Sequence, residues 1–111
     1  MQEIIWDDFA KVELRAGTIL EAEAFPEARK AAYKIKVDFG IYGTRWSSAQ
    51  ITGNYSLKEL PGMQIIGVLN FPPKKIASFV SEFLITGFTD EVGNIVLASV
   101  ERKVPNGSLL I

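Results

Sequence analysis

Apolar and charged residues alternate along residues 12–25, where Glu13 and Arg15 separate apolar neighbours. Alternation with a period of two predicts a β-strand that buries one face. Gly17 interrupts the pattern near its middle, which predicts a bulge or a sharp bend within this long strand.

The rest of the chain divides into short apolar segments separated by turn residues. Residues 53–60 mix turn and helix formers ahead of Pro61-Gly62, which predicts a short helix. The tail is expected to turn at residues 105–107. We expect further strands, including a hairpin through residues 90–94, at residues 33–39, 45–51, 64–71, 83–88 and 95–97.

Three strands, a helix and two more strands follow one another in the order of a five-stranded Greek-key OB barrel. We therefore expect an all-β fold with short helices and with N- and C-terminal extensions. No repeat or linker interrupts the chain, so residues 1–111 are expected to form a single domain. OB barrels bind ligands across strands two and three, between the loops joining strands one–two and four–five.

Those two loops correspond here to residues 26–32 and 72–78. The first carries Arg29 and Lys30, and the second carries Lys74 and Lys75. The expected barrel therefore predicts that the four basic side chains converge at one mouth.

Charge is distributed unevenly, although the net charge is only −1. Residues 1–27 hold seven acidic and two basic side chains, whereas residues 28–78 hold eight basic and two acidic ones. The fold decides whether the basic centre becomes a surface patch.

The chain contains neither histidine nor cysteine, which excludes a Ser-His-Asp triad, a cysteine nucleophile and a conventional zinc site. No P-loop sequence is present. Asp7 and Asp8 form a carboxylate pair, but their neighbours favour a short helix whose amides one of them caps. We predict that the protein is not an enzyme and uses no metal or cofactor.

The segment of residues 68–82 has the composition of a contact surface. An apolar strand runs into Asn70 and Phe71, and Pro72-Pro73 stiffens the chain that follows. Core packing is the alternative for each aromatic side chain, and a solvated loop is the alternative for the lysines. We predict that peptide or RNA contacts this segment, chiefly through Asn70, Phe71, Lys74, Lys75, Phe79 and Ser81.

The third predicted strand offers more candidates. Arg45 and Trp46 are neighbours, so only one of them can point into the binding groove. Ser48 belongs to a polar stretch, residues 47–50, whose hydroxyls and amide could bond a peptide or a phosphodiester backbone. A merely exposed sheet face is the alternative for this stretch.

Both ends of the sequence are apolar, with Ile4, Ile5 and Trp6 at one end and Leu109, Leu110 and Ile111 at the other. A symmetric dimer would hide both groups, and we predict a homodimer on that basis. The chain lacks a signal-peptide pattern and an apolar run that could span a bilayer, so we expect a cytoplasmic location without membrane insertion.

Several segments closely resemble the CsaA family of bacterial export-related chaperones, which use the tRNA-binding OB domain also appended to some aminoacyl-tRNA synthetases. The resemblance is carried by residues 12–19, 25–29, 47–51, 70–77 and 104–107. It implies a homodimeric OB fold that binds unfolded or preprotein segments, contact with the secretion machinery, and tRNA binding by kinship.

The family's ligand-facing loop corresponds to residues 70–82. Its basic pair is commonly arginine, whereas this chain has Lys74 and Lys75, which lack the planar fork that grips phosphate. The chain is also more acidic than dedicated tRNA-binding relatives. The favoured function is therefore an ATP-independent chaperone for unfolded polypeptides, and the alternative is a tRNA- or RNA-binding protein.

Overall fold

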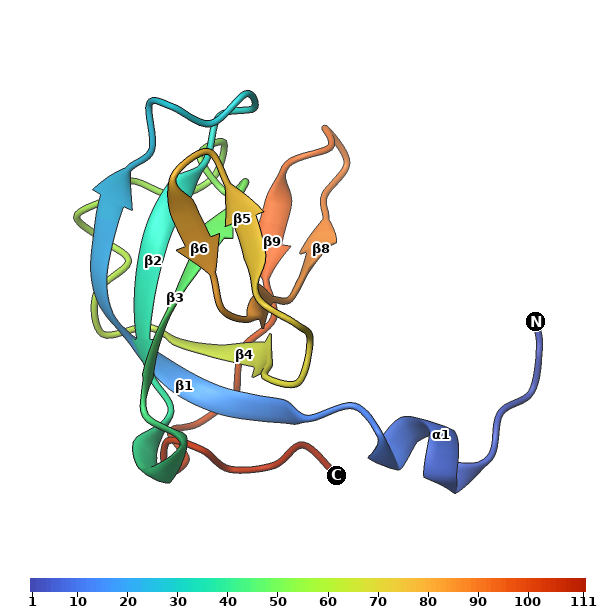
Figure 1. Ribbon diagram of the computed structural model, residues 1–111. Coiled ribbons are helices and arrows are strands. Elements are labelled where there is room, and N and C mark those ends of the chain that lie inside the picture. The colour runs from blue at the N-terminus through green and yellow to red at the C-terminus, as the bar shows by residue number, and fades with distance from the viewer.

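A computed structural model describes residues 1–111 and shows a nearly all-β chain (Figure 1). The main sheet has five antiparallel strands in the order β3-β2-β1-β4-β7, curled into a nearly closed barrel. This confirms the predicted OB-like fold. The strands are β1 (Leu14–Ala24), β2 (Tyr33–Asp38), β3 (Thr44–Ala49), β4 (Gln64–Val68) and β7 (Leu84–Ile85).

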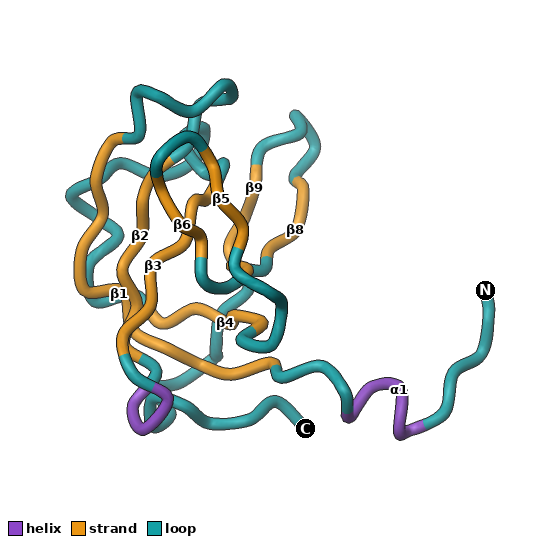
Figure 2. The backbone as a smooth tube through the Cα atoms, in the orientation of Figure 1, coloured by secondary structure: helices purple, strands orange, loops and turns teal.

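The remaining strands form two small hairpins (Figure 2). The first joins β5 (Lys74–Ile76) to β6 (Phe79–Ser81), and the second joins β8 (Gly87–Thr89) to β9 (Ile95–Leu97). Helical structure is limited to α1 (Trp6–Ala10) and a 3₁₀ turn at Gly40–Tyr42. Both are far too short to cross a bilayer, and the cellular location stays a prediction.

Strand β2 shows how the sequence pattern builds the core. Ile35 and Val37 are fully buried, and Phe39 follows on the same face. The Phe39 ring meets Phe83 edge-on, with centroids 4.9 Å apart. Lys34 and Lys36, on the other parity, lie on the outer face, as strand alternation requires.

Of the two predictions for Gly17, the bulge is wrong, because the irregularity in β1 lies between Ile19 and Glu21, and the sharp bend stays a prediction. Gly17 has a different role. A Cβ atom there would lie 2.6 Å from Cγ1 of Val37 and 2.7 Å from the Phe39 ring. The missing side chain therefore lets the core pack directly against the β1 backbone.

The predicted helix at residues 53–60 is also wrong, because this segment consists of turns. Its polar groups bond distant parts of the chain instead of each other. The Asn54 side chain donates to Asp90 and to the Ile95 carbonyl, and the Tyr55 hydroxyl accepts the Leu97 N–H. These contacts outweigh the weak helix propensity of Gly53 and Asn54.

The expected loop at residues 72–78 is a hairpin, β5–β6, with Ala77 in the left-handed region at its turn (φ 54°). The single strand expected at residues 83–88 is divided into β7 and β8. Thr86 donates its N–H to Ile66 on β4 while its carbonyl accepts the Ala98 N–H. The chain thus leaves the barrel there and begins the β8–β9 hairpin, which was correctly predicted.

Two local predictions are confirmed. The tail turns at Pro105, where the Ser108 N–H donates to the Pro105 carbonyl. At α1, the Asp8 carboxylate accepts the Ile5 N–H at 3.2 Å, which is the capping role expected of this acidic pair.

Candidate ligand-binding surfaces

The β5–β6 hairpin lies against β3, and hydrogen bonds from its second strand hold it there. The Glu82 N–H donates to the Trp46 carbonyl at 2.7 Å, and the Trp46 N–H donates to Oε1 of Glu82 at 2.9 Å. One step along, the Ser48 N–H donates to Oγ of Ser81 at 3.3 Å. The hairpin therefore bonds only part of the β3 edge, whereas a full-length strand would pair along all of it.

A cavity of about 530 Å³ opens on one side of this contact. Apolar side chains from the hairpin, from β7 and from the chain before the hairpin form much of its wall. Phe71, 54% exposed, is its most accessible aromatic, and Lys74 is its charged lining residue. Ser48 and Gln50 line it from the β3 side.

A second hollow, of about 430 Å³, is lined by Lys34, Trp46 and Phe79. Together with Phe25 and Lys36, which contact them, these residues form an aromatic–lysine cluster. The Phe79 ring lies 5.3 Å from Phe25 and 6.3 Å from Trp46. Nζ of Lys34 sits 4.9 Å from the Phe25 centroid, and Nζ of Lys36 sits 5.9 Å from Trp46. These distances allow cation–π attraction.

Two carboxylates moderate the charge of this cluster. Glu23 and Glu82 line the same hollow as Lys34. Two negative charges beside the lysines lower the positive potential that a phosphate backbone would meet.

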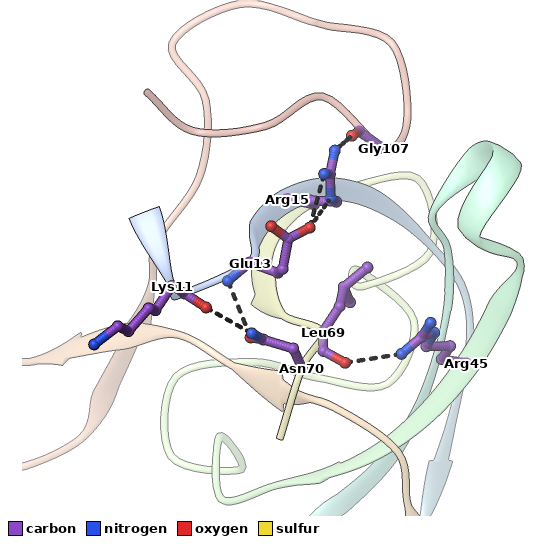
Figure 3. A network of polar contacts seen from close by, with 7 residues as sticks. All are labelled: Lys11, Glu13, Arg15, Arg45, Leu69, Asn70 and Gly107. Atoms are coloured by element: carbon purple, nitrogen blue, oxygen red, sulfur yellow. Dashed lines mark hydrogen bonds and ion pairs between the residues drawn. The ribbon is translucent and has the colours of Figure 1, made fainter. Parts of the chain in front are cut away.

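Several predicted contact residues have internal partners. The Asn70 side chain donates to the Lys11 carbonyl at 2.6 Å and accepts the Glu13 N–H at 3.0 Å, so it ties the start of β1 to the end of β4 (Figure 3). Nη1 of Arg45 donates to the Leu69 carbonyl at 3.0 Å. A ligand contact by Asn70 or Arg45 would have to displace these bonds.

Arg45 and Trp46 point to opposite faces, with Trp46 joining the aromatic–lysine cluster. Ser48 lies on the rim of the first cavity, together with Phe71, Lys74 and Ser81. Phe79 belongs to the second hollow. The predicted candidates that line a hollow are therefore divided between two neighbouring surfaces. Ligand contact by each candidate stays a prediction.

The four loop cations do not share one hollow. Lys74 lines the first cavity, whereas Lys75 is exposed on β5, and Arg29 and Lys30 are exposed on the β1–β2 loop. The root of that loop does meet the hairpin, through the Phe25–Phe79 contact. Convergence of all four cations on one ligand stays a prediction.

Sequence reasoning did not name Lys34 and Lys36 as contact residues. The signal for the two lysines was present, because alternation along β2 places them on the outer face of the barrel. For Gln50 the sequence pointed to the side-chain amide, whereas its main-chain N–H gave no signal, since that depends on which part of the β3 edge remains unpaired. No cluster of three acidic side chains gathers where a metal ion could bind.

The apolar end segments are exposed. Ile4, Ile5 and Trp6 are each about two-thirds exposed, and the segment carrying them extends away from the barrel (Figure 1). Leu109 forms a bridge with Arg15, yet Leu109, Leu110 and Ile111 all remain exposed. A dimer contact through these six residues stays a prediction.

Known proteins share this architecture. Residues 14–109 match the family described as "Putative tRNA binding domain". Chaperone CsaA from Bacillus anthracis strain Ames superposes with a TM-score of 0.93 at 43% identity, covering 99% of this chain and 100% of that one. The CsaA chaperone from Picrophilus torridus gives 0.91 at 44% identity, covering 98% and 100%.

A methionine–tRNA ligase from Porphyromonas gingivalis is 33% identical over 107 residues. The match covers 96% of this chain but only 15% of the ligase. These similarities are to a tRNA-binding domain and to CsaA chaperones, not to a catalytic domain.

Proposed function

Because the chain belongs to the tRNA-binding domain family and is of the CsaA type, we propose that it is a chaperone-like protein that binds unfolded polypeptides without ATP. The observation that carries this proposal is the apolar cavity beside Phe71. Its volume of about 530 Å³ is within the range of ligand pockets, and it accepts a few apolar side chains at a time.

Binding through such a cavity needs no chemical step. A protein that captures exposed apolar segments lowers the concentration of aggregating chains by mass action. The chain lacks histidine and cysteine, and no acidic cluster suited to metal binding is present. We therefore assign no catalytic activity to it. Support of protein export, with contact to the secretion machinery, is part of the proposal and rests on the CsaA resemblance.

The test compares two exposed aromatic residues. Phe71 lines the cavity, whereas Phe88, 70% exposed, lies on β8 outside it. Binding of fluorescent, reduced and carboxymethylated α-lactalbumin, which is permanently unfolded, is measured by anisotropy. We expect Phe71→Ser to weaken binding about tenfold or more, while Phe88→Ser stays within about twofold of wild type. Equal affinities for the two variants would refute the assignment to this cavity.

A second candidate function, RNA or tRNA binding, is favoured by the aromatic–lysine cluster. Bases can stack on Trp46 and Phe79, while Lys34 and Lys36 neutralise phosphates. Glu23 and Glu82 oppose this, so we rank RNA second.

The salt dependence of binding distinguishes the two candidate functions. RNA affinity should fall steeply between about 50 and 200 mM salt, because phosphate contacts release counterions. Capture of an apolar peptide should change little over the same range. A Lys74→Glu/Lys75→Glu variant that loses tRNA but still binds unfolded α-lactalbumin would place the two ligands on different determinants.

A further inference from the structure

The barrel has an incomplete closure between its two edge strands. The main sheet ends at β3 on one side and at β7 on the other, and no ladder joins them. An edge strand exposes backbone donors and acceptors that can pair with an added chain. The β5–β6 hairpin bonds part of the β3 edge, so the unpaired part can be located residue by residue.

Even-numbered residues of β3 direct their main-chain groups away from β2. Both main-chain groups of Trp46 bond Glu82, and the Ser48 N–H bonds the Ser81 hydroxyl. In a strand, the N–H and C=O of one residue point to the same side. The Ser48 carbonyl therefore also faces outward, and it receives only a 3.4 Å contact from the Ser47 hydroxyl.

Gln50 is the next residue of this parity. Its N–H donates to no group of the protein, and the residue is exposed. Gln50 directly follows the last residue of β3. In an antiparallel ladder, the carbonyl of one residue and the N–H two residues on bond the same neighbouring strand, and the Ser48 carbonyl and the Gln50 N–H have this relation in the sequence. Protein groups bond the β3 edge from Trp46 to the Ser48 N–H, and the edge is bare beyond it.

This bare edge lies in a continuous trough. The 530 Å³ cavity and a neighbouring one of about 580 Å³ share Ser48, Gln50 and Leu84 as lining residues. The trough therefore runs from Phe71, past the open edge, to Ile95 on β9. Leu84, 49% exposed, and Phe71 supply apolar wall on either side of the edge.

We propose that an extended polypeptide segment binds in this trough as an added β-strand, pairing its backbone with the Ser48 carbonyl and the Gln50 N–H. Recognition through the main chain supplies affinity without demanding one sequence, and alternate side chains enter the trough. This deepens the proposed function and rests on it: it names how an unfolded client is held and why many clients would fit.

Charge favours a polypeptide over a nucleic acid in the trough. Lys74 is the only charged residue that lines either cavity. One cation attracts a neutral or mildly acidic segment, whereas a phosphate backbone needs several. The preferred occupant is therefore an extended segment with alternating apolar side chains and an acidic residue toward Lys74.

The first test removes one donor from the protein. Gln50→Pro deletes the N–H, while Gln50→Ala keeps it and removes the same side chain. Neither change breaks an internal hydrogen bond of the Gln50 N–H, and proline is tolerated at an unpaired edge position. The probe is a fluorescein-labelled eleven-residue peptide of alternating valine and serine with one aspartate. We expect Gln50→Pro to bind the peptide about fivefold more weakly than Gln50→Ala, because the two variants lack the same side chain and differ in the backbone N–H.

The second test uses the wild-type protein and changes the peptide. N-methylation of the valines in one peptide, and of the serines in another, removes backbone donors of opposite parity. An added strand pairs one parity with β3, so one methylated series should lose at least about tenfold in affinity while the other stays within about threefold. Equal losses would overturn the proposal. This test does not depend on the folding of a variant.

The outcomes separate this inference from the proposed function. If wild-type protein binds no unfolded chain, the proposed function fails. If it binds them, but Gln50→Pro equals Gln50→Ala and the methylation pattern has no parity, only strand addition fails. If single-stranded RNA displaces the peptide and Gln50→Pro weakens that RNA, the trough is a nucleic-acid site and the inference is overturned.

Discussion

Glu82 and Trp46 exchange two hydrogen bonds, one from the Glu82 backbone and one to its side chain, at 2.7 and 2.9 Å. This pair connects the end of the β5–β6 hairpin to β3. It also places Glu82 between the two candidate surfaces, because its side chain lines the hollow of the aromatic–lysine cluster.

Glu82→Ala should therefore loosen the hairpin. The change leaves the part-buried Trp46 N–H without its acceptor, and we expect a loss of about 1–3 kcal/mol in the free energy of unfolding. Urea denaturation monitored by tryptophan fluorescence measures it. Glu91→Ala, at an exposed position of the β8–β9 hairpin, is the matched control and should stay within about 0.5 kcal/mol. Identical losses of unfolding free energy in the two variants would contradict the conclusion that the Glu82 side chain holds the hairpin on β3.

Arg15 ties the tail to β1. Its guanidinium donates to the Gly107 carbonyl at 2.8 Å and to Glu13 (Figure 3). Its Cζ also lies 4.1 Å from the Tyr42 ring centroid. Lysine cannot reproduce this fork and stack. We expect Arg15→Lys to lower the free energy of unfolding by about 1–3 kcal/mol and to speed amide exchange at residues 107–110.

Arg102→Lys is the control for that variant. Arg102 also makes two bonds to a neighbouring carboxylate, that of Glu101, but its side chain is 83% exposed against 13% for Arg15. Exposed ion pairs contribute little, so Arg102→Lys should change the free energy of unfolding much less than Arg15→Lys does. A larger loss for Arg102→Lys than for Arg15→Lys would refute this account of the tail.

Asp90 organises the β8–β9 turn. Hydrogen bonding from the Asn54 side chain, together with the backbone amides of Asn94, Val92 and Gly93, lowers the pKa of Asp90 below its ordinary value. A lowered folded-state pKa contributes stability above the unfolded-state value, and that contribution is lost as pH falls through the folded-state value.

We therefore expect Asn54→Ala to raise the pKa of Asp90 toward the ordinary carboxylate value, as followed by the carboxyl carbon shift in NMR. An unchanged Asp90 titration would show that the backbone amides alone cause the shift.

The exposed N-terminal segment should govern self-association. If Ile4, Ile5 and Trp6 form a dimer contact with the apolar C-terminal residues, the double variant Ile5→Ser/Trp6→Ser should weaken the dimer at least about tenfold in sedimentation equilibrium. Val92→Ser removes a comparably exposed apolar side chain at the tip of the β8–β9 hairpin and should leave the dimer intact. A wild-type protein that sediments as a monomer would contradict the prediction.

The local sequence pattern was sufficient to predict most strands of the barrel. The sequence pattern identified β1 to β4 to within a few residues, and alternation along β2 explains why the structure buries Ile35, Val37 and Phe39 together. The pattern failed where partners far along the chain compete with local preference. Asn54 and Tyr55 bond residues about forty positions away, so residues 53–60 form turns instead of a helix.

In the candidate site, too, the sequence predicted some features and contacts between distant parts of the chain decided the others. Residue types alone predicted an aromatic and basic contact region near residues 70–82, and the missing histidine and cysteine limited its chemistry. Folding then directed the Asn70 amide to Lys11 and Glu13, separated Phe71 from Phe79, and left the Gln50 N–H without a partner. Side-chain alternation is a property of a few neighbouring residues, so it can be read directly from the sequence. Whether a backbone group is paired depends on strands brought together from distant positions, and only their packing determines it.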